Sequence, residues 1–106
     1  MASIRLAVPK TAQSGDIIEI KALIQHEMES GFRRGSRGEV IPRDIIVRFE
    51  CSFEGAQIFA ADFHPAIAAN PLLTFHMRAE MSGRLLFEWT DQNGETWRDS
   101  ADLEVI

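Results

Sequence analysis

DIIVRFECSF, residues 44–53, is the stretch that decides the fold, because polar and apolar side chains alternate along it. Arg48, Glu50 and Ser52 share one parity. The opposite parity is apolar and consists of Ile45, Val47, Phe49, Cys51 and Phe53. Successive side chains of a strand point to opposite faces, so this period of two predicts a strand that covers a core on one side only.

The same alternation extends outward from this stretch to both ends of the chain. It is clear at residues 18–24, 84–90 and 101–105, and weaker strands are expected at 4–8 (ended by Pro9), 56–62 and 72–79. The turns Glu54-Gly55 and Asp91-Gln92-Asn93-Gly94 predict hairpins. Because no segment has the period of an amphipathic helix, we expect an all-β fold. Residues 1–106 should form a single immunoglobulin-like antiparallel sandwich of about seven strands.

Composition narrows the function classes. The chain has 106 residues, a net charge of −5 and 45% hydrophobic residues. An acidic balance argues against nucleic acid and anionic membranes as partners. The local cluster Arg33, Arg34 and Arg37 forms, with His26, either a solvated loop or a surface for an anion or acidic partner. No secretory signal is apparent after Met1, so composition alone indicates the cytoplasm.

Three histidines are the candidates for metal chemistry. His26, His64 and His76 could form a three-histidine site, since such sites are assembled from distant parts of β folds. None has the HxH or HxxxH spacing that places two ligands together locally. A metal-dependent redox enzyme of the superoxide reductase kind is therefore the enzymatic alternative, while His76 is most simply a residue on the face of its strand.

Cys51 is the single cysteine, so neither an internal disulfide nor a cysteine-based zinc site is expected. A catalytic thiol paired with a histidine is conceivable. Its position among the apolar residues of its strand instead predicts a small buried hydrophobe. Two longer connections, residues 25–43 and 64–71, are not tight turns, and long loops of compact domains often carry function.

The sequence of these two connections resembles the SoxZ family of bacterial thiosulfate oxidation. His26-Glu27-Met28-Glu29-Ser30-Gly31, followed by Arg33 and by Val40-Ile41-Pro42-Arg43, is similar to a family stretch that reads HPMETG…R…IPR. Residues 62–71, DFHPAIAANP, look like the family segment DLHPAISANP. Val8-Pro9-Lys10 with Gly15 looks like the start of the family sequence, and Trp89-Thr90-Asp91 with Gly94 resembles a late family hairpin that reads WTD…G. Glu27 departs from the pattern, because the family usually has proline there.

The resemblance implies a function without catalysis. Members of the SoxZ family are immunoglobulin-like subunits that pair with SoxY, whose C-terminal arm carries a cysteine to which sulfur intermediates are attached. They bring no catalytic group and no cofactor, and they are exported to the periplasm together with SoxY. Other Sox enzymes meet the pair transiently, and the SoxY-binding face allows self-association when SoxY is missing. A free-standing immunoglobulin-like module for another ligand is the remaining alternative.

Partner-binding residues are expected in the two long connections and on the strands beside the second one. Leu72, Leu73, Phe75 and Met77 are apolar at both parities, which predicts a strand covered on both sides. The expected partner-binding residues are His26, Met28, Glu29, Arg33, Pro42, Phe63, His64, Pro65, Asn70, Leu73 and Phe75.

Overall fold

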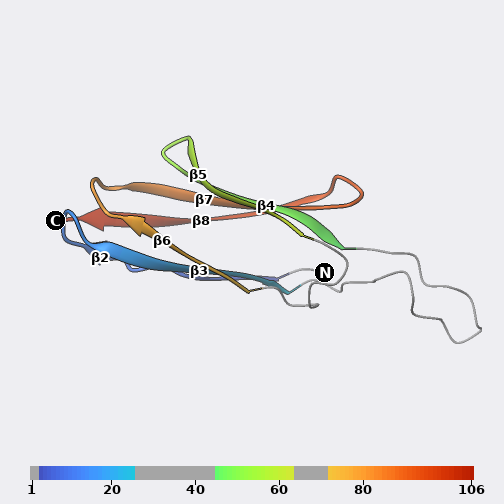
Figure 1. The fold of residues 1–106 in the computed structure, drawn as a ribbon, viewed down its shortest axis with the longest axis horizontal. Helices are drawn as coiled ribbons and strands as arrows, with labels where there is room; N and C mark the ends of the chain where they lie inside the picture. The colour runs from blue at the N-terminus through green and yellow to red at the C-terminus, as the bar shows by residue number, and fades with distance from the viewer. Residues whose placement is uncertain (1–2, 26–44, 64–71) are drawn as a thin grey trace, which may run out of the picture.

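The computed structural model describes residues 3–25, 45–63 and 72–106, and these residues form eight strands and no helix. The strands lie in two facing layers (Figure 1). No helix in the described part of the chain is long and apolar enough to span a bilayer. The strands are β1 (Ser3–Ala7), β2 (Thr11–Ala12), β3 (Ile17–Gln25), β4 (Ile46–Phe53), β5 (Ala56–Asp62), β6 (Leu72–Arg78), β7 (Gly83–Asp91) and β8 (Thr96–Val105).

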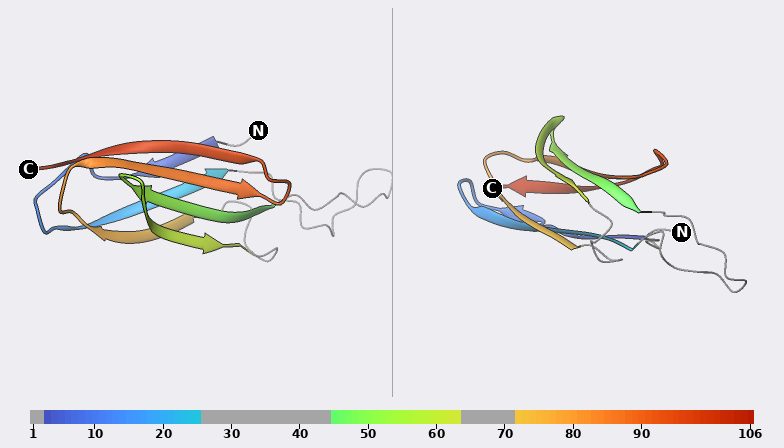
Figure 2. Two further views of the ribbon diagram at one scale, coloured as in Figure 1. Left: turned by 90° about the horizontal axis from the view of Figure 1, so that it is seen from above. Right: turned by 45° about the vertical axis from the view of Figure 1, so that its right-hand side comes forward.

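The two layers are a three-stranded sheet in the order β1-β3-β6 and a five-stranded sheet in the order β2-β8-β7-β4-β5. Neighbouring strands run antiparallel, except that β2 pairs parallel with β8. The views in Figure 2 show the two sheets stacked over one another. The prediction of an all-β, immunoglobulin-like sandwich is therefore confirmed.

Alternating side chains from both sheets fill the space between the layers, as the sequence predicted for β3 and β7. The inward residues of β3 are Ile18, Ile20, Ala22 and Ile24, and each is buried. Their outward neighbours Glu19 and Lys21 are exposed. The largest side chains that are fully buried are Trp89, Phe49, Phe87, Ile20, Ile24, Ile46, Leu85 and Cys51.

The start of β4 departs from the predicted alternation. The pairing of β4 with β7 shifts register between Ile46 and Arg48, so one extra residue is inserted there. Ile46 is consequently 1% exposed, and Val47, which the alternation placed in the core, is only partly buried. A bulge of this kind reverses the parity of the strand on one side of it, and the sequence gives no sign of it.

The two predicted hairpins are present. Glu54 and Gly55 form a two-residue turn between β4 and β5, with φ of 48° and 85°. Two positive φ values are what a type I′ turn requires, and this turn matches the right-handed twist of the strands. Between β7 and β8, Asp91 is buried, and its Oδ1 accepts the backbone N–H of Asn93 and of Glu95, both at 2.9 Å.

One strand was not predicted. After Pro9 the chain leaves the three-stranded sheet and crosses to the five-stranded one, where Thr11 and Ala12 pair with Glu104 and Val105. Proline cannot donate a hydrogen bond to a sheet, and Pro9 was predicted to end the first strand. β1 does end before Pro9, and the chain then changes sheets, so that β2 contributes just two residues to its new neighbour.

Candidate interaction site

The structure describes only part of the predicted partner-binding set. His26, Met28, Glu29, Arg33, Pro42, His64, Pro65 and Asn70 lie outside the described residues. Phe63 and Phe75 are each 7% exposed, and Leu73 is partly buried against the same core. Leu72 is 56% exposed and shares the outer face of β6 with Thr74 and His76. In this chain alone β6 is thus covered on one side, and the partner role of these residues stays a prediction.

One flank of the sandwich, between β5 and β6, is closed by aromatic rings. The rings of Phe59 and Phe75 stack with centroids 4.4 Å apart and an interplanar angle of 2°. Phe49 reaches both of them from inside the core, at 6.0 and 6.2 Å. Offset or tilted aromatic pairs of this kind add stability beyond the area that they bury. They join the edge of one sheet to the edge of the other.

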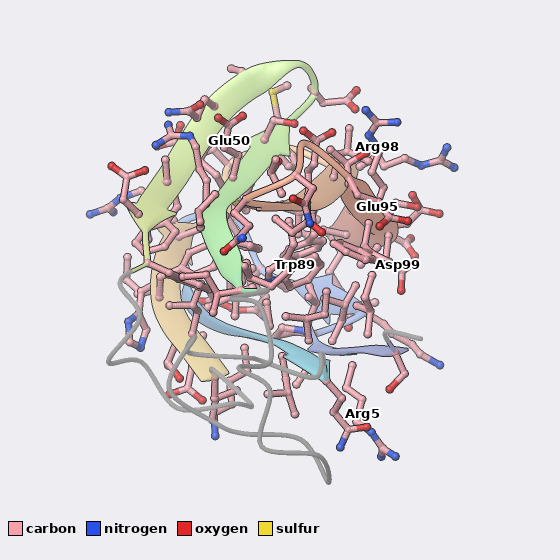
Figure 3. The ribbon with its side chains drawn as sticks, turned by 90° about the vertical axis from the view of Figure 1, so that its right-hand side faces the viewer. Arg5, Glu50, Trp89, Glu95, Arg98 and Asp99 are labelled. Atoms are coloured by element: carbon pink, nitrogen blue, oxygen red, sulfur yellow. The ribbon has the colours of Figure 1, made fainter. Side chains whose placement is uncertain are left out.

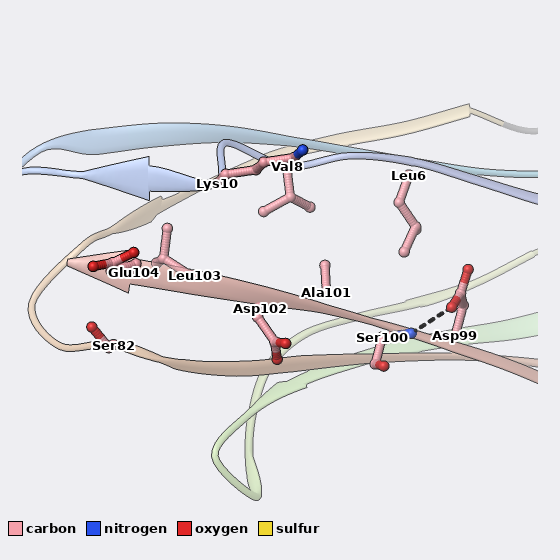
Figure 4. Close-up of a pocket in the computed structure, with 10 residues that line it drawn as sticks. All are labelled: Leu6, Val8, Lys10, Ser82, Asp99, Ser100, Ala101, Asp102, Leu103 and Glu104. Carbon is pink, nitrogen blue, oxygen red and sulfur yellow. Dashed lines mark hydrogen bonds between the residues drawn. The ribbon is translucent and has the colours of Figure 1, made fainter.

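The opposite flank, between β1 and β8, is open. A groove of about 620 Å³ runs between Leu6 and Val8 on one side and Ala101 and Leu103 on the other. Figure 4 shows Leu6 and Val8 pointing toward β8, with Ala101 and Leu103 pointing back toward them. Ala101 is too small to fill the space between the two strands. Apolar side chains therefore line the groove without closing it.

Charged groups lie at the groove and along its rim. Asp99 has the inward parity of Ala101 and Leu103, and its Oδ1 accepts the backbone N–H of its neighbour Ser100 at 2.8 Å. Asp102 bonds outward to Arg84 Nε at 3.0 Å. No ion pair between described residues involves Asp99, so its charge is available to a cation that enters the groove.

The outer face of the five-stranded sheet carries ion pairs within and between its strands. Arg48 joins Glu50 at 2.6 Å and Asp62 at 2.7 Å, and these carboxylates raise the pKa of its guanidinium. Arg98 pairs with Glu88 on the neighbouring strand. Figure 3, a view along the strands, places Glu50 and Arg98 outside the layers and Trp89 between them. Exposed pairs of this kind contribute little stability, and they mark this face as solvated.

Comparison with known proteins identifies the family. The family model for the sulphur oxidation protein SoxZ matches residues 4–102. The chain belongs to the SoxZ family. This confirms the resemblance that the two long connections carry. The match leaves only Ser3 of β1 and the last three residues of β8 outside it among the described strands. SoxZ-family membership gives the chain a part in sulfur oxidation. No curated protein sequence matches the chain.

Solved structures similar to this SoxZ-family chain share its fold at low sequence identity. The superoxide reductase (neelaredoxin) of Ignicoccus hospitalis has a TM-score of 0.76 at 15% identity, over 98% of this chain and 80% of that one. The sulfur carrier protein SoxY of Chlorobium limicola f thiosulfatophilum has 0.69 at 13%, over 97% and 78%. A putative superoxide reductase of Thermotoga maritima has 0.76 at 12%, over 97% and 85%. Likeness at this identity concerns the fold alone.

The likeness to superoxide reductases returns attention to the three histidines. His76 is the one that lies among the described residues, and it projects from the outer face of β6, 57% exposed, with its Nε2 3.7 Å from Glu19 Oε2. His26 and His64 are outside the described residues. Within the described ranges no three metal-ligating side chains come together. His76 is therefore a residue of the strand face, as its place in the sequence indicated.

Cys51 is buried in the core of this SoxZ-family chain, as the alternation predicted. It is 0% exposed and sits opposite Phe59 on one neighbouring strand and Phe87 on the other. Burial raises the pKa of its thiol to about 12. A thiol that is both inaccessible and protonated is a poor nucleophile. It is equally unsuited to an interchain disulfide.

Sequence reasoning missed the groove between β1 and β8. Its signals were present, because Asp99 interrupts the apolar parity of Trp97, Ala101 and Leu103, and Pro9 ends the pairing of β1. Neither signal distinguishes an open flank from an ordinary strand end until the course of β2 is known. The groove follows from the strand change at Pro9, which depends on contacts between residues far apart in the sequence.

Proposed function

We propose that this chain is the non-catalytic subunit of a SoxYZ carrier, which binds SoxY and helps to present its covalently attached sulfur intermediates to the enzymes of thiosulfate oxidation. The observation that carries the proposal is the SoxZ family match over residues 4–102. The environment of Cys51 supports the proposal that the sulfur-carrying thiol belongs to SoxY and not to this chain. A carrier thiol must be exposed and ionisable, and Cys51 is neither.

The likeness to SoxY supports a pairing of two similar sandwiches. The sulfur carrier protein SoxY of Chlorobium limicola has the same fold over 97% of this chain. Two subunits of one fold bind through whatever surfaces they do not use for their own cores. In this chain the candidates are the two long connections and the flanks of the sandwich. The described outer face of the five-stranded sheet is the least suitable, because its ion pairs keep it solvated.

Co-expression with the SoxY of the same genome tests the pairing. We expect both chains to elute together in size-exclusion chromatography, at the size of a heterodimer or larger, and the isolated chain to show no turnover of thiosulfate. A chain that elutes alone in the presence of SoxY would contradict the proposal. Stoichiometric iron, zinc or copper in the isolated chain, measured by metal analysis, would instead favour the metalloenzyme built from His26, His64 and His76.

The compartment is part of the proposal. Transport with SoxY predicts that the chain reaches the periplasm when SoxY carries its own export signal. When that signal is deleted, both chains should stay in the cytoplasm. Cell fractionation followed by immunoblotting measures this directly, and a chain that reaches the periplasm without SoxY would show that export is independent.

The first long connection is proposed to meet the client enzymes. Arg33→Ala should weaken binding of a client Sox enzyme to the assembled pair by about tenfold, as expected for loss of one charged contact at an interface. Arg5→Ala is the matched control, because Arg5 is exposed on the outer face of β1. Equal affinities of both variants, measured by surface plasmon resonance, would remove this role from Arg33.

A further inference from the structure

The open flank exists because an edge strand changes sheets too early to cover its neighbour. β1 pairs with β3 up to Ala7, the chain turns at Pro9, and β2 reaches β8 only at Glu104 and Val105. Most of β8 is therefore without a neighbour on this side among the described strands. The groove of about 620 Å³ lies along this uncovered part, between β8 and the inner face of β1 (Figure 4).

The uncovered edge of β8 is ready for one more strand. Glu104 and Ile106 donate their backbone N–H groups to Lys10 and Ala12 at 3.0 and 2.9 Å, so they point away from β7. Backbone groups alternate sides along an antiparallel strand. The backbone N–H and C=O groups of Arg98, Ser100 and Asp102 consequently point to the same side as those of Glu104, away from β7. No described strand lies on that side to bond with them. β2 already pairs with the end of β8, and the rest of this edge can bind another strand in the same way.

The lining of the groove specifies what such a strand must carry. Its inward side chains would enter beside Asp99 and Ala101, because these residues face the groove. Ala101 leaves room for an apolar side chain against Leu6 and Val8. Asp99 is a carboxylate without an ion pair among the described residues. The added segment should therefore have a basic side chain opposite Asp99 and apolar side chains two residues before and after it.

Charge selects the class of occupant. Two copies of this chain that paired antiparallel about Ser100 would set Arg98 of each against Asp102 of the other, but both Asp99 carboxylates would enter the same groove on neighbouring rows. Lys10 lies at the far end of the groove, and each copy carries a net charge of −5. Like charges on facing strands are destabilising. Inward-pointing charges also protect edge strands against pairing with their own kind. A second copy is therefore disfavoured, whereas an extended segment with a lysine or arginine is favoured.

We infer that the groove between β1 and β8 is a docking site for an extended segment of a partner protein, which adds a strand to the edge of β8. The backbone of Arg98, Ser100 and Asp102 supplies the hydrogen bonds, and the side chains of the segment supply specificity. Every second side chain enters the groove, with a basic one at Asp99. This assignment concerns a surface of the chain itself and does not depend on SoxY being the partner.

A pair of blocked heptapeptides tests the site. The first, Thr-Val-Thr-Lys-Thr-Val-Thr, places lysine at the centre, so that both strand directions bring it to Asp99. Its twin has glutamate in place of lysine. In titrations of the isotope-labelled chain followed by NMR, the lysine peptide should shift the amide resonances of Arg98, Ser100, Asp102 and Leu6. It should bind about tenfold more tightly than the twin at low salt.

Three variants assign the effect to the groove. Asp99→Asn keeps an acceptor for the Ser100 N–H and removes the charge, so the lysine peptide should lose its advantage. Glu80→Gln removes an equal charge from an exposed position that does not line the groove, and it should leave the advantage intact. Ala101→Leu fills the groove and should weaken both peptides while the melting curve stays that of a folded domain.

Several outcomes overturn the inference. Absence of shifts with either peptide, shifts confined to the edge of β5, or an advantage of the lysine peptide that survives Asp99→Asn would each do so. Concentration-dependent shifts of the same β8 amides without any peptide would assign this edge to a second copy of the chain. Because no experiment here contains SoxY, failure of this inference is distinct from failure of the carrier proposal.

Discussion

The two flanks of the sandwich end the same core in opposite ways. Between β5 and β6 the rings of Phe59 and Phe75 stack at 4.4 Å and close the gap between the sheets. Between β1 and β8 the corresponding positions hold Ala101 and the charged Asp99, and a groove remains. Both flanks have edge strands, yet only the first has side chains large enough to reach across.

The closed flank contributes to stability, whereas the open flank provides a surface for binding. A closed flank contributes packing energy, since the stacked rings contact each other and Phe49. An open flank forgoes that energy and leaves an apolar surface and backbone groups to another molecule. Substitutions in the two flanks should accordingly affect different properties, and the following experiments compare them in order of decreasing effect.

Protection of Cys51 should give the largest effect. The thiol lies opposite Phe59 beside the closed flank, and its pKa is raised from an ordinary 9.0 to about 12 by burial. Because only the thiolate reacts, labelling at pH 8 should be about a thousandfold slower in the folded chain than in urea, from the pKa shift alone. A disulfide-exchange reagent followed by absorbance measures both rates.

The same shift fixes a pH dependence. A raised folded pKa stabilises the folded state below the unfolded pKa of about 9, and this contribution is lost as the pH rises from 9 toward 12. Labelling of the unfolded chain should level off above pH 9, whereas labelling of the folded chain should keep rising. Fast labelling at pH 8 without urea would show that the closed flank opens readily.

Phe75→Ala should come next. Removing a buried ring that contacts Phe49 and Phe59 leaves a cavity, and we expect a loss of about 3–5 kcal/mol in the free energy of unfolding, measured by urea denaturation. Phe75→Leu is the control, because it keeps apolar volume and should lose less. A loss below about 1 kcal/mol for Phe75→Ala would mean that the stack does not hold the flank closed.

Enlarging an alanine should distinguish the flanks by a smaller margin. Ala22 is 0% exposed in β3, so Ala22→Leu overpacks the core and should cost about 1–3 kcal/mol. Ala101→Leu adds the same atoms to the open groove and should change stability by less than about 0.5 kcal/mol. Equal losses in thermal unfolding experiments would show that the groove is closed in solution.

Leu6→Ala should cost less than the core substitutions Phe75→Ala and Ala22→Leu. Leu6 is only partly buried on the groove side of β1, and shortening it leaves no enclosed cavity. We expect a loss of about 1 kcal/mol, below the range for a buried leucine. A loss above about 3 kcal/mol, measured by urea denaturation, would place Leu6 in the core and argue against an open flank.

Local patterns in the sequence predicted the parts of the fold that depend on neighbouring residues. Alternation located β3 and β7 and the burial of Cys51, and Glu54-Gly55 located a hairpin. The bulge at Val47 and the pairing of β2 were missed, because both depend on registers between strands that are distant in the sequence. The groove depends on the same long-range course of the chain, so it was missed as well.

The candidate partner residues show the opposite limitation. The resemblance of the two long connections to the SoxZ family identified the family correctly, and the family match confirms it. The resemblance could not say which side chains are accessible. Phe63 and Phe75, two of the expected partner contacts, are each 7% exposed in the core, and their partner role stays a prediction. In the sequence, an apolar residue next to a functional loop looks the same whether it packs in the core or contacts a partner.

Trp89 and Trp97 face each other across β7 and β8, and this pairing gives the protein an optical readout of its own. The chain has two tryptophans and no tyrosine, so its intrinsic emission comes almost entirely from this pair. Trp89 is 0% exposed, whereas Trp97 is partly buried two residues from Asp99. A Trp97→Phe variant would leave a blue-shifted emitter that reports on the core. A Trp89→Phe variant would leave one whose spectrum follows events at the β8 edge.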